Sequence, residues 1–307
     1  MGRVFDDLPR GGRVAVLRLR SLGDCVLTTP ALEILRRARP DARVAVAVEE
    51  RFRAVFEGNR TIDEILPPEF GSLRRFRPDL CLNLHGGTRS AWLTAASGAR
   101  WRAGFGHFRN GFAYNVRIPR AQEILGEERT VHTAEHLASA MFYLGAPVGE
   151  IPRAKLVAAH ANARQCARAC PTGVIHAVAA AYEKTWSAGG FRAVAKHLQC
   201  TGIEPVFIGA ASDDLSPFSA FRTLQGAPLD EVKNLLASSC LFVGNDSGPA
   251  HMAAAFGLPV VVIFGNSNPA IWGPWRTASE VVSSPRGIGG VTTDQVLEAL
   301  SRLRVAA

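Results

Sequence analysis

The sequence predicts an α/β protein with two halves, each built around a parallel sheet covered by helices. Short apolar runs alternate with segments whose apolar residues recur at helical spacing, which is typical of strands joined by crossover helices. This alternation stops between about residues 150 and 170 and then restarts. Because 307 residues are enough for two domains of ordinary size, we expect domains at 1–155 and 156–307.

The first half begins with the apolar run RVAVLRL, a predicted strand, followed by the glycine turn RSLGD and a helix. Periodicity and punctuating residues place the remaining elements. We expect strands at 13–19, 42–50, 62–67 and 79–86, and helices at 25–38, 51–59 and 130–147, the last stopped by Gly145 and Pro147. Alternating strands and helices of this kind predict a parallel sheet covered on both faces.

The second half repeats the pattern after an irregular stretch that ends near Pro171. We expect strands at 173–181, 204–210, 240–245 and 259–265, and helices at 191–202, 229–239 and 249–257. We also expect the last helix of the chain to pack back on the first half. No short repeat or low-complexity tract interrupts either half.

The composition is that of a protein that folds by burial: 47% of residues are apolar and 20% are charged. No stretch approaches the ~20 uninterrupted apolar residues of a transmembrane helix, and the N-terminus lacks an apolar signal core. We therefore expect a cytoplasmic protein with free thiols. The six cysteines are scattered, and only Cys166 and Cys170 are close, without the histidine partners typical of a zinc site.

The formal charge of +8 comes from an excess of arginine, with runs such as EILRRARPDAR and SLRRFRPD. Such runs are compatible with solvated faces, or with attraction to nucleotide phosphates, an anionic membrane leaflet or nucleic acid. No basic element with interleaved aromatic residues supports nucleic-acid binding.

The segment LFVGNDSGPAHMAAAFGLPVVVIFG places a polar cluster between a strand and a helix, at the edge where open α/β sheets bind ligands. Asp246 or Ser247 can cap the helix, Gly248 permits close backbone approach, and Pro249 suits the first helical position. The helix amides then favour a phosphate, with His251 beside it, although a capped helix with a satisfied histidine is the alternative. Because a carboxylate repels a diphosphate, we expect Asp246 to be a cap or a partner of His251.

The turn SLGD places Asp24 near the N-terminus of a helix in the first half. A carboxylate at this position can cap the helix, or it can take a proton from an incoming hydroxyl group. Lys184 follows the first strand of the second half, where it can neutralise a phosphate or lie exposed without a role. Asp213 and Asp214 occupy another strand end, where acids can accept hydrogen bonds from ribose. Neither GxGxxG nor GxxxxGK[ST] is present.

Three stretches, in order, resemble the glycosyltransferase family 9 heptosyltransferases: RLRSLGDCVLTTPALEILRRARPDARV, ERFRAVFEGNRTIDEIL and FVGNDSGPAHMAAAFGLPVVVIFGNSNPAIWGPW. The similarity runs in patches from about Arg13 to Trp275. It implies a GT-B fold, in which two Rossmann-like domains face each other across a cleft, acceptor side first and nucleotide-sugar donor side second. It also implies inverting transfer of L-glycero-D-manno-heptose from ADP-heptose to the inner core of lipopolysaccharide, without a metal or another cofactor.

The resemblance carries roles to particular residues. Asp24 matches the proposed general base, and Lys184 matches the lysine that contacts the donor phosphates. Asp213 or Asp214 matches the acid that holds the ribose. The donor diphosphate loop corresponds to Asp246, Ser247, Gly248, Pro249, Ala250 and His251. The basic first half fits an acceptor with phosphates or Kdo carboxylates at the inner membrane, with peripheral contact to that membrane.

One segment departs from the family. Its members usually have proline and glycine after the histidine of this strand, whereas HAVAAAYEKTW has alanines and valine between His176 and Tyr182. We expect either that alanine amides form a similar bend, or that donor affinity or identity has changed. The alternatives are therefore a transferase of this fold with another nucleotide-sugar or glycan acceptor, and a non-catalytic nucleotide-sugar-binding relative. A Rossmann oxidoreductase lacks its glycine fingerprint here.

Overall fold

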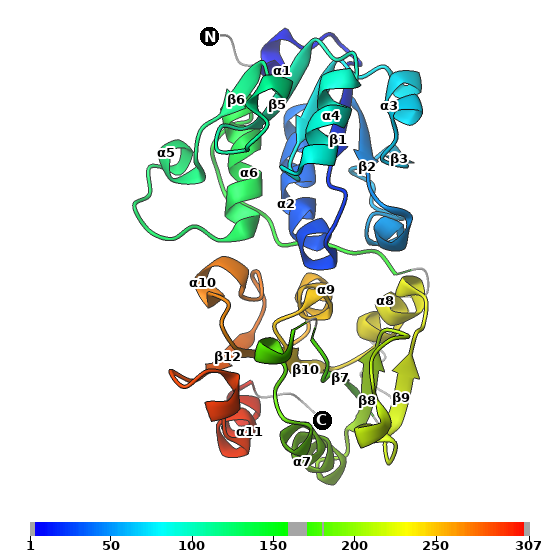
Figure 1. The fold of residues 1–307 in the computed structure, drawn as a ribbon, viewed down its shortest axis with the longest axis vertical. Coiled ribbons are helices and arrows are strands. Elements are labelled where there is room, and N and C mark those ends of the chain that lie inside the picture. The colour runs from blue at the N-terminus through cyan, green and yellow to red at the C-terminus, as the bar shows by residue number, and fades with distance from the viewer. Residues whose placement is uncertain (1–3, 159–170, 180, 304–307) are drawn as a thin grey trace. The chain divides into compact units, whose positions relative to one another are not determined.

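The computed structural model describes residues 4–158, 171–179 and 181–303, and the chain divides into two compact units, Met1–Lys155 and Leu156–Ala307 (Figure 1). Each unit contains one six-stranded sheet in which all neighbouring strands are parallel. The predicted α/β class with two parallel sheets is confirmed.

The first sheet has the strand order β3-β2-β1-β4-β5-β6. Its strands are β1 (Arg13–Leu17), β2 (Arg43–Ala47), β3 (Glu64–Leu66), β4 (Leu80–Asn83), β5 (Trp101–Phe105) and β6 (Val116–Ile118). The helices are α1 (Val4–Asp7), α2 (Leu22–Ala38), α3 (Phe70–Phe76), α4 (Thr88–Ala96), α5 (Ala121–Leu125) and α6 (Thr133–Leu144), with 3-10 turns η1 (Glu50–Val55) and η2 (Gly111–Ala113). Helices α2 and α6 pack side by side (Figure 1).

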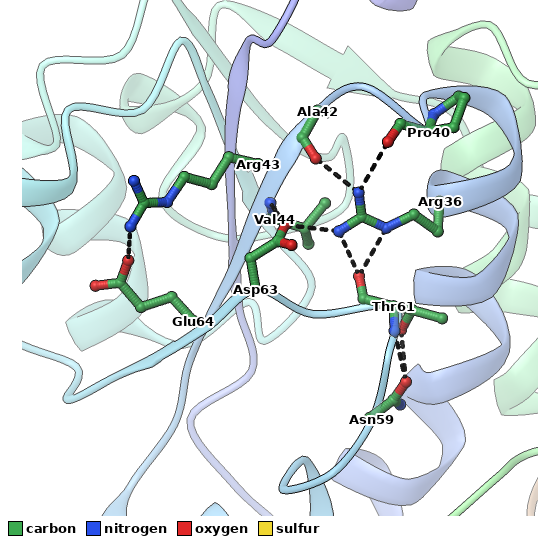
Figure 2. A network of polar contacts seen from close by, with 9 residues as sticks. All are labelled: Arg36, Pro40, Ala42, Arg43, Val44, Asn59, Thr61, Asp63 and Glu64. Atoms are coloured by element: carbon green, nitrogen blue, oxygen red, sulfur yellow. Dashed lines mark hydrogen bonds and ion pairs between the residues drawn. The ribbon is translucent and has the colours of Figure 1, made fainter.

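The arginine run at the end of α2 has a structural role. Arg36 donates to the carbonyl oxygens of Ala42 at 2.7 Å and Thr61 at 3.1 Å, and to the carboxylate of Asp63 at 2.6 Å (Figure 2). Arg39 donates in the same way to the carbonyl of Phe5 at 2.7 Å. These two arginines therefore attach α2 to neighbouring segments, and they belong neither to a solvated face nor to an anion site.

The second sheet has the strand order β12-β11-β10-β7-β8-β9. Its strands are β7 (Thr172–His176), β8 (Glu204–Gly209), β9 (Arg222–Gln225), β10 (Leu241–Asn245), β11 (Val260–Phe264) and β12 (Ser279–Ser283). The helices are α7 (Ala188–Cys200), α8 (Leu229–Ala237), α9 (Gly248–Phe256), α10 (Pro269–Trp272) and α11 (Thr293–Arg302), with 3-10 turns η4 (Tyr182–Lys184), η5 (Ser216–Phe218) and η6 (Ile288–Gly290).

The last helix, α11, buries Val296, Ala299 and Leu300 in the core of its own unit, against β11, β12 and α7. Its apolar face is thus used within the second unit. The expected packing of this helix on the first half stays a prediction.

The ends of most predicted elements lie within three residues of those in the structure, and two elements differ more. The expected helix at 51–59 is the 3-10 turn η1, and the expected strand at 173–181 ends at His176. The missed elements include β5, β6, β9 and β12. Strand β9 shows the reason, because it is an edge strand, RTLQ, whose residues are mostly exposed and carry no apolar pattern to detect.

Candidate active site

Asp24 lies in the first turn of α2, directly after the turn that follows β1. Its Oδ1 accepts a hydrogen bond from Arg18 Nη1 at 3.3 Å, and its Oδ2 accepts one from Ser21 Oγ at 3.0 Å. Ser21 is the N-cap residue of α2, and its side chain makes no capping hydrogen bond. Asp24 is therefore not the helix cap that one interpretation of the sequence suggested. Two side chains orient its carboxylate, which remains 24% exposed.

Arg18, directly after β1, was not singled out in the sequence. Its side chain is only 6% exposed, and its Nε is buried without a hydrogen-bond partner among the described residues. Burial lowers the pKa of the guanidinium, and the negative charge of Asp24 opposes that shift. A buried arginine stays charged and needs an anion nearby, so Arg18 and Asp24 depend on each other as one ion pair. A charged residue interrupting the apolar run VAVLRL was the signal that could have revealed it.

His85 follows β4, the neighbour of β1 in the sheet, and so reaches the same edge as Asp24. The buried amide of Asn83, the last residue of β4, fixes this loop by accepting from the backbone N–H groups of His85 and Gly86. His85 Nδ1 lies 3.1 Å from the carbonyl oxygen of Arg20. Burial, followed by the charge of Arg18, lowers the pKa of His85, so the imidazole is neutral at neutral pH.

Two further histidines lie at the carboxyl end of β5 and on α6. The ring of His136 stacks on Phe105, with centroids 3.9 Å apart, and lies 5.5 Å from the ring of His107. Burial, with the nearby His107 and Arg18, lowers the pKa of His136 to about 4. Burial, followed by the charge of Arg120, also lowers the pKa of His107. Asp24, His85 and His107 follow three adjacent strands, so this edge of the first sheet is a polar site with neutral imidazoles.

The corresponding edge of the second sheet contains the turn between β10 and α9. Ser247 is the N-cap residue of α9, but its side chain makes no capping bond and its Oγ instead lies 2.9 Å from His176 Nδ1. Pro249 is the second helical residue, one later than expected. His251, in the first turn, is buried at 5% exposure. The prediction that Asp246 or Ser247 caps α9 is wrong, because both side chains have other partners.

Asp246 has Lys184 as its partner: Nζ lies 3.2 Å from Oδ2. The carboxylate is 9% exposed, and the lysine side chain is 40% exposed. Asp246 therefore holds a partly exposed ammonium group beside the N-terminus of α9. That Asp246 is not itself a phosphate ligand stays a prediction.

The segment between β7 and α7 is fixed although it lacks proline and glycine. Asn245, fully buried at the end of β10, accepts from the backbone N–H of Trp186 at 3.0 Å and donates to the carbonyl of Ala177 at 2.9 Å. The indole N–H of Trp186 donates to Val291 at 2.9 Å. Gly265 matters here because a Cβ at this position would collide with the carbonyl of Glu183. These contacts hold η4 and Lys184 at the sheet edge.

Asp213 and Asp214 lie in the loop after β8, the neighbour of β7. Asp213 Oδ2 accepts from the backbone N–H of Ala210 at 2.8 Å, and Asp214 Oδ1 accepts from that of Ser216 at 2.9 Å. The bonds to Ser216 lower the pKa of Asp214. Burial lowers the pKa of His176 to about 4, and the charge of Asp213 opposes this shift. Of the two acids, Asp213 is thus the one whose charge acts on His176, and a ribose contact by either acid stays a prediction.

Comparison with known proteins decides the family. The model of glycosyltransferase family 9 (heptosyltransferase) matches residues 70–290. The chain belongs to glycosyltransferase family 9. It is 26% identical to lipopolysaccharide heptosyltransferase 3 of Escherichia coli (strain K12), covering 84% of this chain and 83% of that protein.

Solved structures of this family share the fold. The structure of a family 9 glycosyl transferase from Veillonella parvula has a TM-score of 0.82 at 22% identity, over 97% of this chain and 99% of that chain. The structure of E. coli ADP-heptose lps heptosyltransferase II has a TM-score of 0.78 at 21% identity, over 95% and 98%. The predicted GT-B fold is therefore confirmed.

The described part of this glycosyltransferase also has a hollow away from the two sheet edges. A hollow of about 430 Å³, lined by Arg13, Arg43 and Arg75 among others, lies where β1 and β2 begin, at the opposite edge from Asp24. Among the described residues, no three metal-ligating side chains gather and no helix is long and apolar enough to cross a bilayer. Cys166 and Cys170 lie outside the described residues.

Proposed function

We propose that this family 9 glycosyltransferase moves L-glycero-D-manno-heptose from ADP-heptose to the inner core of lipopolysaccharide, with inversion and without a metal. The names of the similar proteins, a lipopolysaccharide heptosyltransferase and an ADP-heptose heptosyltransferase, support this donor and acceptor. In this proposal, the first unit binds the acceptor and the second unit binds the donor. The enzyme works in the cytoplasm and contacts the inner membrane peripherally.

The observation that carries the proposal is the state of the Asp24 carboxylate. It is partly exposed, it lies at the carboxyl edge of the first sheet, and its oxygens are oriented by Arg18 and Ser21. A general base needs an accessible oxygen in a fixed direction. Asp24 therefore takes the proton of the acceptor hydroxyl as its oxygen attacks the anomeric carbon.

The donor side supplies positive charge to the leaving ADP. Lys184 and the N-terminal amides of α9 face the edge of the second sheet, and both favour a diphosphate. As the bond from the anomeric carbon to the diphosphate oxygen breaks, these groups stabilise the charge left on ADP. Attack from the opposite face inverts the anomeric configuration. The ordered Asn245 network supports an intact donor site despite the altered segment after His176.

A panel of nucleotide sugars tests the proposal. We expect ADP-heptose to raise the melting temperature more than UDP- or GDP-sugars at equal concentration, since ligands that bind only the folded state stabilise it. A preference for another nucleotide would overturn the donor assignment. Binding of ADP-heptose without transfer to any inner-core saccharide would favour the non-catalytic alternative.

A further inference from the structure

The positive charge of the chain is concentrated in one segment. Residues 70–120 contain nine arginines, no lysine and one acidic residue, Asp79, for a net charge of +8. Outside this segment, 26 basic residues (35 minus nine) face 26 acidic residues (27 minus one). The rest of the chain is therefore neutral overall, and any attraction to a large anionic partner originates in this part of the first unit.

Most of these arginines lack an acidic partner, unlike Arg36 and Arg39. Eight of the nine are exposed: Arg74, Arg75, Arg77, Arg89, Arg100, Arg109, Arg117 and Arg120. Within the part of the chain that the structure describes, Arg89 is the only one of the nine with a carboxylate oxygen within 4 Å, that of Glu49 at 3.8 Å. Ion pairing inside the protein thus leaves the charge of this segment available to a partner.

Exposed aromatic rings lie in the same segment. Trp92 on α4 is 54% exposed and Phe112 on η2 is 59% exposed, and their ring centroids are 5.1 Å apart. Arg89 precedes Trp92 by one helical turn, Arg117 Nη2 lies 3.4 Å from the carbonyl of Gly111, and Arg109 lies in the loop before η2. We call Trp92, Phe112, Arg89, Arg109 and Arg117 the aromatic–arginine surface.

We propose that the aromatic–arginine surface docks the first unit on a bilayer of anionic phospholipids. Tryptophan and phenylalanine rings insert at the depth of the headgroups, and arginines around them pair with lipid phosphates. This inference rests on the proposed function in one respect: a lipid-linked acceptor would have to be met at such a surface.

Charge and ring geometry favour lipid over nucleic acid. The planes of Trp92 and Phe112 make an angle of 58°, and the rings pack on each other. Single-stranded nucleic acid is bound by open ring faces on which successive bases stack. Two tilted rings in mutual contact form an apolar projection with a basic rim, which suits insertion between headgroups better than base stacking.

The test is sedimentation with vesicles of phosphatidylcholine alone, or of equal parts phosphatidylcholine and phosphatidylglycerol, without donor or acceptor. We expect the protein to bind only the anionic vesicles. Arg89→Gln, Arg109→Gln and Arg117→Gln together should weaken binding about a hundredfold, since each arginine near an anionic surface contributes roughly fivefold. Trp92→Ser with Phe112→Ser should weaken it about tenfold through lost apolar burial.

Matched controls remove the same groups elsewhere. Arg10→Gln, Arg60→Gln and Arg286→Gln delete three exposed arginines outside the segment, and Tyr143→Ser deletes an exposed ring on α6. These variants should keep parental vesicle binding within about threefold, because they leave the aromatic–arginine surface intact.

Three results would overturn the docking surface. The surface variants could bind vesicles as tightly as the parent, or they could change the oligomeric state. A DNA oligonucleotide could also displace the parent protein from the vesicles, with an affinity that the surface variants lose. Transfer to a water-soluble, deacylated acceptor separates this proposal from the proposed function. Surface variants should retain that transfer. If the proposed function is wrong, the parent protein itself will not transfer heptose to this acceptor, although it will still bind the vesicles.

Discussion

Each unit contains a similar ion pair, but the more exposed partner is the carboxylate in the first unit and the ammonium group in the second. In the first, Arg18 is 6% exposed and Asp24 is 24% exposed, with 3.3 Å between them. In the second, Lys184 is 40% exposed and Asp246 is 9% exposed, with 3.2 Å between them. Both pairs lie at the carboxyl edge of a parallel sheet, beside the first turn of a helix.

This difference in burial decides which charge a ligand can meet. In the first unit the guanidinium of Arg18 is buried and the carboxylate of Asp24 is accessible, which suits removal of a proton. In the second unit the carboxylate of Asp246 is buried and the ammonium group of Lys184 is accessible, which suits binding of a phosphate. The separation between the charges is nearly the same, so the chemistry of each edge follows from which partner is covered by the protein.

Removing the accessible carboxylate should have the largest effect. We expect Asp24→Asn to lower kcat/KM about a thousandfold, within the range of general base catalysis, while ADP-heptose affinity stays unchanged. Steady-state transfer and calorimetric donor binding measure the two quantities. Asp7→Asn, on the exposed end of α1, is the control. A parental transfer rate in Asp24→Asn would show that Asp24 is not the base.

Removing the buried cation of the same pair should have the next largest effect. We expect Arg18→Met to lower kcat about a hundredfold, because the carboxylate loses its orientation. The free energy of unfolding should fall by less than the roughly 3–5 kcal/mol typical of breaking a fully buried pair, because Asp24 is 24% exposed and keeps its hydrogen bond from Ser21. Arg18→Lys should recover part of kcat. If the variant is destabilised enough for unfolding to account for its lower kcat, Arg18 only supports the fold.

Removing the accessible cation of the second unit should weaken donor binding. We expect Lys184→Met to raise the dissociation constant for ADP about thirtyfold, which is the size of one charge-assisted hydrogen bond. Lys196→Met, an exposed lysine on α7, should leave it unchanged. If ADP bound Lys184→Met as tightly as the parent, the comparison between the two pairs would fail on the donor side.

Acid should destabilise both units, and the largest contribution in each comes from the histidine whose pKa is lowered most, His136 in the first unit and His176 in the second. The pKa is about 4 for His136 and His176, against an ordinary 6.5, so the unfolded chain takes up their protons first as pH falls. Stability is therefore full above pH 6.5 and declines toward pH 4. Between pH 7 and 5.5 we expect each to contribute a loss of about 1 kcal/mol.

Urea unfolding at the two pH values measures the acid effect. His136→Asn and His176→Asn should each reduce the difference between pH 7 and pH 5.5, whereas the exposed His197→Asn should not. Because burial also lowers the pKa values of His85 and His107, part of the difference should remain. A pH difference that is undiminished in the double variant would assign the acid sensitivity to other groups.

The sequence predicted most of the central strands, because β1, β2, β4, β10 and β11 are buried runs with clear apolar patterns. It could not predict β9, whose outward residues carry no such pattern. The segment after His176 shows a second limit. Its alanines continue an apolar run and so predict a longer strand, but the strand ends at His176, and the side chain of Asn245 bonds to Ala177 and Trp186 beyond it.

The sequence by itself determined the α/β class, the family resemblance and the candidate status of Asp24 and Lys184, because local patterns and motif order carry that information. Only the tertiary structure decided their partners. Arg18 reaches Asp24 across a turn, and Lys184 reaches Asp246 over 62 positions of the chain. Burial depends on every element packed around a side chain, and so spacing along the chain could not reveal which charge of each pair is exposed.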